Sequence, residues 1–463
     1  MNLKIQEQII ESLFNEEGNV NSTEEILSWL NNLNKSTLVN ISETNINENS
    51  FWFYDDRNGE ILNRKRSFFS ITGMRLFTDD KFILEQPIIV QNEIGYLGII
   101  AKEIDGVINF LMQAKIEPGN VNCVQLSPTI QATKSNFTRA HGGRLPHYFE
   151  WFDNAGKTST VIYDQIQSEQ GSRFSGKRNR NIIILTDKEI PLHPNYKWMT
   201  LGQIKTLLQK DNLVNMDTRT VLSALPAVIG KIEGRGGMAK KNSPLYKSMY
   251  DSDFSDFTKA NTLLNNYKMY HEVHKTFIPL NQLVDWEIDN YGIISKKQAD
   301  FCVRYYNIEI HGREVQNWTQ PLFKAKSKAL FVLFTAVDNG IRKFLITLHP
   351  EIGCFDKVEF GPSLQISDED NAEQSQLYKI FKACEKSQNG ILKDVILSEE
   401  GGRFYHEQNR NVIIDIDINE TDVPENALWV DYASLNLMIM GNNNLNIQLR
   451  NLISLLDFKE LIC

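Results

Sequence analysis

The sequence has few cysteines, and none is spaced as a metal site or a paired redox motif would require. The 463 residues include five cysteines, Cys123, Cys302, Cys354, Cys384 and Cys463. No two of them form a CxxC pair, and no His–Cys spacing is typical of a zinc site. Because scattered single cysteines are typical of the reducing cytosol, we expect a cytoplasmic protein without a zinc centre.

Long hydrophobic runs and an excess of positive charge are also missing. No apolar run approaches the roughly twenty residues of a membrane span. The start of the chain, MNLKIQEQIIES, lacks the basic and then apolar stretches of a signal peptide. The formal net charge of −9 argues against a general nucleic-acid-binding protein. We therefore expect no membrane and no nucleic acid as partner, although a local basic cluster could bind an anionic small ligand.

What is present suits a globular protein that contains both helices and strands. Hydrophobic residues make up 41% of the chain, an ordinary share for a protein with buried cores. Two capping boxes, Ser22–Glu25 and Thr200–Gln203, predict the starts of helices. Asp105-Gly106 stands between two apolar runs and predicts a two-residue β-hairpin, because both of its residues tolerate a positive φ.

A long internal repeat divides the chain. QPIIVQNEIGYLGIIAKEIDGVINFLMQAKIEPG begins at Gln86 and aligns without a gap with QPLFKAKSKALFVLFTAVDNGIRKFLITLHPEIG, which begins at Gln320. A repeat this long indicates duplicated domains and not a solenoid, whose period would be about 20–50 residues. We therefore expect four parts: an N-terminal helical extension (1–50), a first domain (51–226), a linker (227–284) with a helix over 258–275, and a second domain (285–463).

The first copy contains an unusually dense set of polar residues. QAKIEPGNVNCVQLSPTIQATKSNFTRAHGG runs from Gln113 to Gly143, directly after the predicted hairpin, and offers few apolar runs to hide its side chains. The second copy keeps a glutamate at Glu351 but has His349 in place of Lys115. We therefore expect the first domain to carry the chemistry, and the second domain to bind a similar ligand without turning it over or only to support the fold.

Three side chains of this stretch are candidates for acid–base chemistry. Glu117 could act as a general base if partial burial raised its pKa, although its Glu-Pro-Gly setting is also ordinary turn chemistry. His141 titrates closest to neutral pH and could equally be structural. Lys115 could stabilise an enolate oxygen as a fixed positive charge.

A basic segment, SGKRNRN, follows further along the first copy. It supplies Lys177, Arg178 and Arg180, and arginine suits bidentate contacts with phosphate, so the segment predicts a pyrophosphate site. The alternative is a solvated loop that leads into a strand over Ile182–Leu185. SEQGSRFSGKRNRNIII recurs as SEEGGRFYHEQNRNVII from Ser398, which favours a task shared by both copies, in binding or in folding.

These motifs resemble the NDP-hexose 2,3-dehydratases of deoxysugar biosynthesis. The resemblance rests on QAKIEPGNVNCVQLSPTIQAT, QSEQGSRFSGKRNRN and DNLVNMDTRTVLSALP in the first copy, and on REVQNWTQPL and LSEEGGRFYHEQNRN in the second. It implies an α+β (α/β/α-like) fold with two tandem Nudix-like domains, each a mixed sheet flanked by helices, in a homodimer. Because the Nudix pyrophosphohydrolase motif is absent, we expect no metal. Because a ketone of the implied substrate already serves as the electron sink, we expect no redox cofactor either.

The implied substrate is dTDP-4-keto-6-deoxy-glucose, and the implied reaction is a β-elimination of water. The C4 ketone acidifies the C3 proton, a base removes this proton to give an enolate, and the C2 hydroxyl leaves with help from an acid. The resulting 3,4-diketo-2,6-dideoxy sugar would pass to a downstream 3-ketoreductase. A nucleotide-4-ketosugar epimerase using the same enolate and a non-catalytic nucleotide-sugar-binding protein remain alternatives.

On this basis we expect catalysis from Glu117, His141 and Lys115. The residues expected to bind the substrate are Gln113, Gln125, Ser127, Gln131, Thr133, Asn136, Arg139, Gly142, Gly143, Arg173, Asn179, Arg180 and Asn181. The candidates for a second site are Glu351, Gln365, Arg403, Asn409, Arg410 and Asn411. Arg173 stands where the family commonly has an aromatic residue, and this departure could alter the sugar contacts.

Overall fold

The computed structural model describes the chain except for residues 1–2, 47–50, 139–144, 226–240, 298, 312–314, 370–374 and 462–463. We refer to residues 3–225 as the first half and to residues 241–461 as the second half. Both halves mix helices and strands, so the protein is of the α+β class. Within the described residues, no helix is long and apolar enough to cross a membrane.

The helices and strands of the first half have the following bounds. The helices are α1 (Leu3–Phe14), α2 (Thr23–Ser36), α3 (Lys134–Phe137), α4 (Phe149–Asp153), α5 (Leu201–Leu207) and α6 (Met216–Leu222). The strands are β1 (Val39–Glu43), β2 (Trp52–Asp55), β3 (Glu60–Asn63), β4 (Ser70–Thr78), β5 (Lys81–Val90), β6 (Gly95–Ile104), β7 (Val107–Ile116), β8 (Val124–Ser127), β9 (Ile130–Ala132), β10 (Thr160–Ser168), β11 (Arg178–Leu185) and β12 (Tyr196–Met199).

The second half is built from a similar series. Its helices are α8 (Pro244–Tyr250), α9 (Ser255–Tyr270), α10 (Gln376–Ser387), α11 (Tyr432–Ile439) and α12 (Ile447–Leu455). Its strands are β13 (Val273–Ile278), β14 (Trp286–Asp289), β15 (Gly292–Ser295), β16 (Phe301–Ile310), β17 (Asn317–Ala325), β18 (Ala329–Asp338), β19 (Ile341–His349), β20 (Glu359–Gly361), β21 (Leu364–Ile366), β22 (Ile391–Ser398), β23 (Gln408–Asp415) and β24 (Ala427–Asp431).

Each half contains a seven-stranded sheet, and the two sheets match strand for strand. The first has the order β10-β11-β6-β7-β12, with β8 on β7 and β9 on β6. The second has the order β22-β23-β18-β19, with β20 and β24 on β19 and β21 on β18. One parallel pair occurs at the same place in both, β11 with β6 and β23 with β18, so both sheets are mixed.

Local sequence signals correctly place several of these elements. Asp105-Gly106 forms the hairpin between β6 and β7, with φ values of 51° and 84°. The capping boxes at Ser22–Glu25 and Thr200–Gln203 begin α2 and α5. The helix expected over 258–275 is shorter at its end: α9 stops at Tyr270, and the following β13 is a strand.

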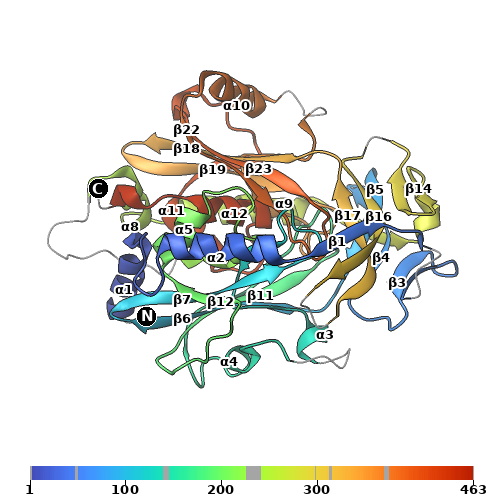
Figure 1. Cartoon of the computed structure of the whole chain (residues 1–463). Coiled ribbons are helices and arrows are strands. Elements are labelled where there is room, and N and C mark those ends of the chain that lie inside the picture. The colour runs from blue at the N-terminus through green and yellow to red at the C-terminus, as the bar shows by residue number, and fades with distance from the viewer. Residues whose placement is uncertain are drawn as a thin grey trace.

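The two large sheets enclose a shared layer of helices (Figure 1). Helices α5, α11 and α12 lie between the sheets, and α10 lies on the outer face of the second-half sheet. Phe110 of β7 and Phe344 of β19 belong to the same buried cluster, together with Leu207 of α5 and Leu449 of α12. One hydrophobic core therefore joins the halves, because the inner faces of both sheets pack on the same helices.

Two five-stranded small sheets lie to one side, and each receives a strand from the other half. β13-β4-β3-β2 with β5 forms one sheet, and β1-β16-β15-β14 with β17 forms the other. Thus β1 of the first half pairs with β16, and β13 of the second half pairs with β4. The boundaries expected from the sequence, which assign β1 to an extension and β13 to a linker, stay a prediction.

Candidate functional site

A cavity of about 900 Å³ lies where the halves meet, and both halves contribute to its wall. The first half provides the end of β7 and the strands β9 and β11. The second half provides residues of β17 and part of the SEEGGRF segment (398–404). Six residues expected in the first site line this cavity: Lys115, Glu117, Gln131, Thr133, Asn136 and Asn179.

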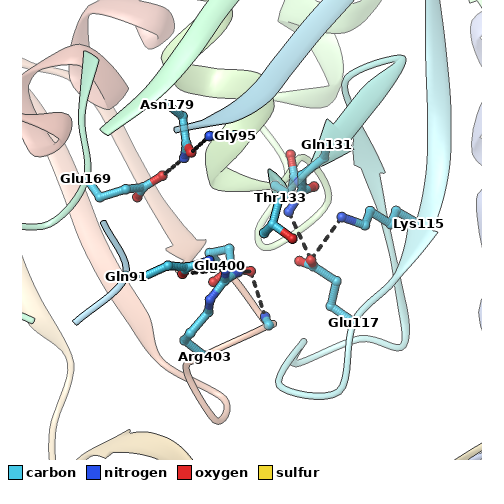
Figure 2. A network of polar contacts seen from close by, with 12 residues as sticks. Gln91, Gly95, Lys115, Glu117, Gln131, Thr133, Glu169, Asn179, Glu400 and Arg403 are labelled. Carbon is cyan, nitrogen blue, oxygen red and sulfur yellow. Dashed lines mark hydrogen bonds and ion pairs between the residues drawn. The ribbon is translucent and has the colours of Figure 1, made fainter. Parts of the chain in front are cut away.

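Glu117 is held in the cavity wall by an ion pair and an amide (Figure 2). It follows β7 directly, and the residue is 6% exposed. Its Oε1 lies 3.2 Å from the Lys115 ammonium and accepts a 2.9 Å hydrogen bond from Gln131. Its Oε2 is buried and has no hydrogen-bond partner among the described residues. Since buried carboxylate oxygens are normally bonded, Oε2 is a candidate to accept a proton or a hydrogen bond from a ligand.

The amide of Gln131 is itself fixed by the start of α6. Asn215 caps that helix and donates to Gln131 Oε1 at 3.0 Å and to Ser127 Oγ at 2.8 Å. Ser127 therefore supports the amide chain that positions Glu117, and it does not line the cavity itself.

The turn after Glu117 is the point at which the halves touch. The Gly119 N–H donates to the Gly401 carbonyl at 2.7 Å, and a Cβ at position 119 would lie 1.6 Å from the Phe404 carbonyl oxygen. The second half repeats the arrangement, since Gly353 donates to Gly171 at 2.7 Å and its Cβ would lie 1.8 Å from the Phe174 oxygen. Each Glu-x-Gly turn therefore packs on the Gly-x-Arg-Phe segment of the opposite half, and only glycine allows such close approach.

At this contact, two arginines have the opposite places from those expected from the sequence. Arg403, expected in a second site, lines the cavity beside Glu117 and pairs with Glu400 at 2.7 Å. Arg173, expected to bind the substrate, does not line the cavity. It pairs instead with Asp300 at 3.0 Å and lies over the Phe301 ring, 4.0 Å from its centre.

The SGKRNRN segment is a strand from Arg178 onward, so the alternative interpretation, a solvated loop that leads into a strand at Ile182, is wrong. Side chains alternate along β11, and the buried Asn179 faces the cavity side. Arg180 points to the other side, where it pairs with Asp164 at 2.7 Å and donates to the Tyr96 hydroxyl at 3.2 Å. Arg178 lies over the Phe355 ring. Of the three basic residues, only Lys177 lines the cavity.

The other residues expected to bind substrate lie outside this cavity or outside the described chain. Gln125 donates to Ser398 Oγ of the other half at 2.7 Å. Gln113 and Asn181 do not line the cavity. Four of the expected residues fall outside the described residues: Arg139, His141, Gly142 and Gly143.

Several ionisable residues of the cavity were missing from the expected set, foremost Glu400. Burial raises the pKa of Glu400 to about 7, although Arg403 opposes the shift. Burial also raises the pKa of Glu169, and it raises the pKa of Asp217 well above its ordinary value. Burial, and secondarily Arg403, lower the pKa of Lys177, which the SGKRNRN segment had predicted as a phosphate contact, to about 8. The repeat contained one signal for Glu400, because the aligned residue of the first copy is Gln170.

The second half contains an equivalent network of a glutamate, a glutamine and an asparagine, but it lacks the lysine. Gln365 donates to Glu351 at 2.8 Å and accepts from Asn446 at 2.8 Å, as Gln131 does with Glu117 and Asn215. Burial raises the pKa of Glu351 to about 7 and lowers the pKa of His349, which replaces Lys115, to about 4. The histidine is therefore neutral near pH 7, and this network lacks the fixed charge that Lys115 provides.

The remaining second-site candidates take part in local contacts. Asn409 donates to Glu399, and Asn411 donates to the Asn409 carbonyl at 3.0 Å. Arg410 pairs with Asp394 at 2.7 Å, as Arg180 does with Asp164 in the first half. Within the described part of the chain, no group of three or more His, Cys, Asp or Glu residues is arranged to hold a metal ion.

Two buried arginines outside the expected site residues join the halves. Arg219 donates to the Ser398 carbonyl at 2.7 Å, and Arg450 donates to the Ser168 carbonyl. They occupy equivalent places on α6 and α12. Arg219 therefore anchors Ser398 at the start of the segment that contains Glu400 and Arg403, and Arg450 anchors Ser168 at the start of the equivalent first-half segment.

Comparison with known proteins decides the family. The sequence model of the NDP-hexose 2,3-dehydratase family matches residues 23–225 and again residues 258–456, more than half of the chain. This chain belongs to that family. It is therefore a nucleotide-sugar 2,3-dehydratase, a hydro-lyase, and the function expected from the motifs is confirmed.

Similar proteins from three bacteria bear one name, dTDP-4-dehydro-6-deoxy-alpha-D-glucopyranose 2,3-dehydratase. The protein of Streptomyces violaceoruber is 36% identical over 92% of this chain and 95% of its own length. That of Saccharopolyspora spinosa is 35% identical over 88% of this chain and 85% of its own. That of Amycolatopsis orientalis is 31% identical over 94% of this chain and 90% of its own. The likeness to these dehydratases thus extends over nearly all of both chains.

Proposed function

We propose that this dehydratase acts on dTDP-4-keto-6-deoxy-glucose and produces a 3,4-diketo-2,6-dideoxy sugar nucleotide. The names of the three relatives support this substrate. The observation that carries the proposal is the buried Lys115–Glu117 pair at the end of β7, in a cavity large enough for a nucleotide sugar.

In the proposed reaction, Glu117 accepts the C3 proton and Lys115 stabilises the oxygen at C4. The electron pair of the C3–H bond forms an enolate, and the charge of Lys115 offsets the charge that develops on the oxygen. The C2–O bond then breaks, C2 and C3 become doubly bonded, and water leaves. The enol at C3 loses its hydroxyl proton, and C2 gains a proton from solvent. The ketone serves as the electron sink, so we assign no redox cofactor and no metal.

The rest of the cavity suits the dTDP portion. Lys65, Lys177 and Arg403 supply positive charge for a diphosphate, and Phe68 and Trp318 supply apolar ring surface for a pyrimidine base. We assign the sugar contacts to Gln131, Thr133, Asn136 and Asn179, which line the same cavity.

We also propose the type of domain, the oligomeric state and the enzyme that uses the product. The two matched mixed sheets support duplicated Nudix-like domains, of which the first carries the catalytic lysine. Assembly as a homodimer and transfer of the product to a 3-ketoreductase complete the proposal. They rest on the family resemblance and on the reactivity of a 3,4-diketone.

The first test is incubation with dTDP-4-keto-6-deoxy-glucose in deuterated buffer without added metal or nicotinamide. We expect mass spectrometry to show loss of one water and deuterium at a sugar carbon. Deuterium exchange without loss of water would instead indicate an epimerase. Binding without either change would indicate a nucleotide-sugar-binding protein.

A further inference from the structure

The cavity contains a second carboxyl group that comes from the opposite half of the chain. Glu400 lies in the SEEGGRF segment and lines the same cavity as Glu117. We propose that Glu400 is the general acid that protonates the C2 hydroxyl as it leaves, while Glu117 removes the C3 proton. This inference rests on the dehydration proposed above and adds a catalytic residue to it.

The position of Glu400 is fixed by two hydrogen bonds to one of its oxygens. Oε1 accepts from the Arg403 guanidinium at 2.7 Å and from the Gly402 N–H at 3.1 Å (Figure 2). Glu400 is 5% exposed, and both of these hydrogen bonds go to Oε1 and not to Oε2. Arg403 in turn donates to Gln91 at 2.8 Å and lies over Phe68. A preorganised carboxyl with one oxygen left over can present a proton to a bound sugar.

The charges around the two carboxyl groups suit opposite roles. Glu117 lies 3.2 Å from the Lys115 ammonium, and its buried Oε2 has no hydrogen-bond partner among the described residues, so this oxygen is placed to accept a proton. Glu400 is buried and faces Arg403, Glu117, Glu169 and Lys115, and the net effect raises its pKa to about 7. A substantial fraction of Glu400 is therefore protonated near neutral pH. Two carboxyl groups with different surroundings in one cavity are a common arrangement for acid and base.

The two copies show that the fold does not require an acid at this position. Gln170 occupies the equivalent place in SEQGSRF, within the same type of turn. That turn packs on the Glu351 network, where His349 has replaced Lys115. Lys115 and Glu400 therefore occur together at the cavity, and both are replaced at the equivalent place around Glu351. This is expected if the two residues serve one reaction.

In the step proposed, the Glu400 proton is transferred to the C2 oxygen as the C2–O bond breaks. The electron pair of that bond leaves with the oxygen, so water departs and Glu400 becomes a carboxylate. The enolate electrons form the C2–C3 double bond. Glu400 is reprotonated from solvent, while Glu117 releases the proton that it took from C3.

The test is Glu400→Gln, compared on two substrates that differ in their need for an acid. Glutamine keeps the acceptor oxygen for Arg403 and already fills the equivalent place in the first half. With dTDP-4-keto-6-deoxy-glucose we expect kcat to fall about 10²–10⁴-fold, because acid assistance is lost. With the 2-deoxy-2-fluoro analogue we expect fluoride release near the wild-type rate, because fluoride leaves an enolate without protonation. Exchange of the C3 proton with solvent should persist.

The matched control is Glu399→Gln, the same change in the neighbouring residue. Burial also raises the pKa of Glu399 to about 7, but it bonds to Asn409 and does not line the cavity. We expect this variant to turn over the natural substrate normally. Equal losses of Glu400→Gln on both substrates, or no loss on either, would overturn the proposal.

A wild-type measurement covers the case in which Glu400→Gln does not fold. The kcat for the natural substrate should fall as pH rises above about 7, whereas fluoride release from the analogue should not. Identical pH profiles for the two substrates would refute the role of Glu400. Failure of the wild type to release water from the natural substrate would instead refute the proposed function itself.

Discussion

Among the expected site residues, Glu117 and Lys115 are the pair whose position in the fold was easiest to predict from the sequence. A hairpin dipeptide, a strand and a Glu-Pro-Gly turn are all local signals, so the end of β7 could be located before any contact was known. Glu400 could not be found in this way. Glu117 and Lys115, with which it shares the cavity, are 283 and 285 residues away in the chain. Local sequence patterns do not predict such contacts between the halves.

Replacing Glu117 by glutamine should remove the base while a side chain of nearly the same size and shape fills its position. We expect kcat to fall about 10²–10⁴-fold, because an amide cannot accept the C3 proton. Binding of dTDP, measured by calorimetry, should change little, because Gln131 can still donate to the new side chain. Glu189→Gln, a change at a side chain that is 95% exposed, is the control. Normal turnover by Glu117→Gln would contradict the role of this residue.

Substrate binding should weaken in alkaline solution, because Lys177 loses its positive charge there. Its lowered pKa of about 8 means that the ammonium is charged below that pH and neutral above it. If it binds a diphosphate, KM should rise as pH increases through about 8. Lys177→Arg keeps its charge throughout this range, so its KM should stay flat. Profiles of KM from pH 6.5 to 9.5 test this, and the same rise in both proteins would exclude Lys177 as the cause.

At the scale of elements, helices and hairpins were predictable where their signals lie within a few residues. The capping boxes of α2 and α5 are of this kind. The strands β1 and β13 were missed because each is short and pairs with a sheet of the other half. One signal was present: Leu30-Asn31-Asn32 before β1 recurs as Leu264-Asn265-Asn266 before β13. The repeat therefore extends beyond the ranges that the longest motifs delimit.

The turns at Gly119 and Gly353 should tolerate no side chain. A Cβ at either position would lie within 2 Å of a carbonyl oxygen of the opposite half, so the backbones must separate. We expect Gly119→Ala to destabilise the protein by about 1–3 kcal/mol and to lower activity by displacing Glu117 and Glu400. Gly353→Ala should destabilise similarly but affect activity less. Thermal denaturation and kcat measure the two effects.

Gly106→Asn is the control for these turn variants. This glycine has φ +84°, which asparagine tolerates, and a Cβ there would meet nothing within 4 Å. Its melting temperature should stay close to that of the wild type. Unchanged stability and activity of Gly119→Ala would show that the contact between the halves is not tight in solution.

For the whole molecule, the repeat reveals that the halves are alike but not that they are intertwined. Similarity between two segments says nothing about which surfaces face each other. In the structure the halves share a hydrophobic core, exchange β1 and β13, and place their Gly-x-Arg-Phe segments on each other's turns. The proposed dehydratase site is consequently built from both halves, although the lysine and the base that we assign to it come from one half.

Cutting the chain between Gly236 and Gly237, by an inserted protease site, should therefore leave an active complex. The shared core and the two exchanged strands should hold the fragments together in gel filtration, with kcat close to that of the uncut protein. Residues 1–236 expressed alone should release no water from the substrate, because they lack Glu400, Arg403 and the strand β13. Mixing the fragments after dilution from urea should restore turnover. Dehydration by residues 1–236 alone would contradict a site built from both halves, whatever the fate of the cut protein.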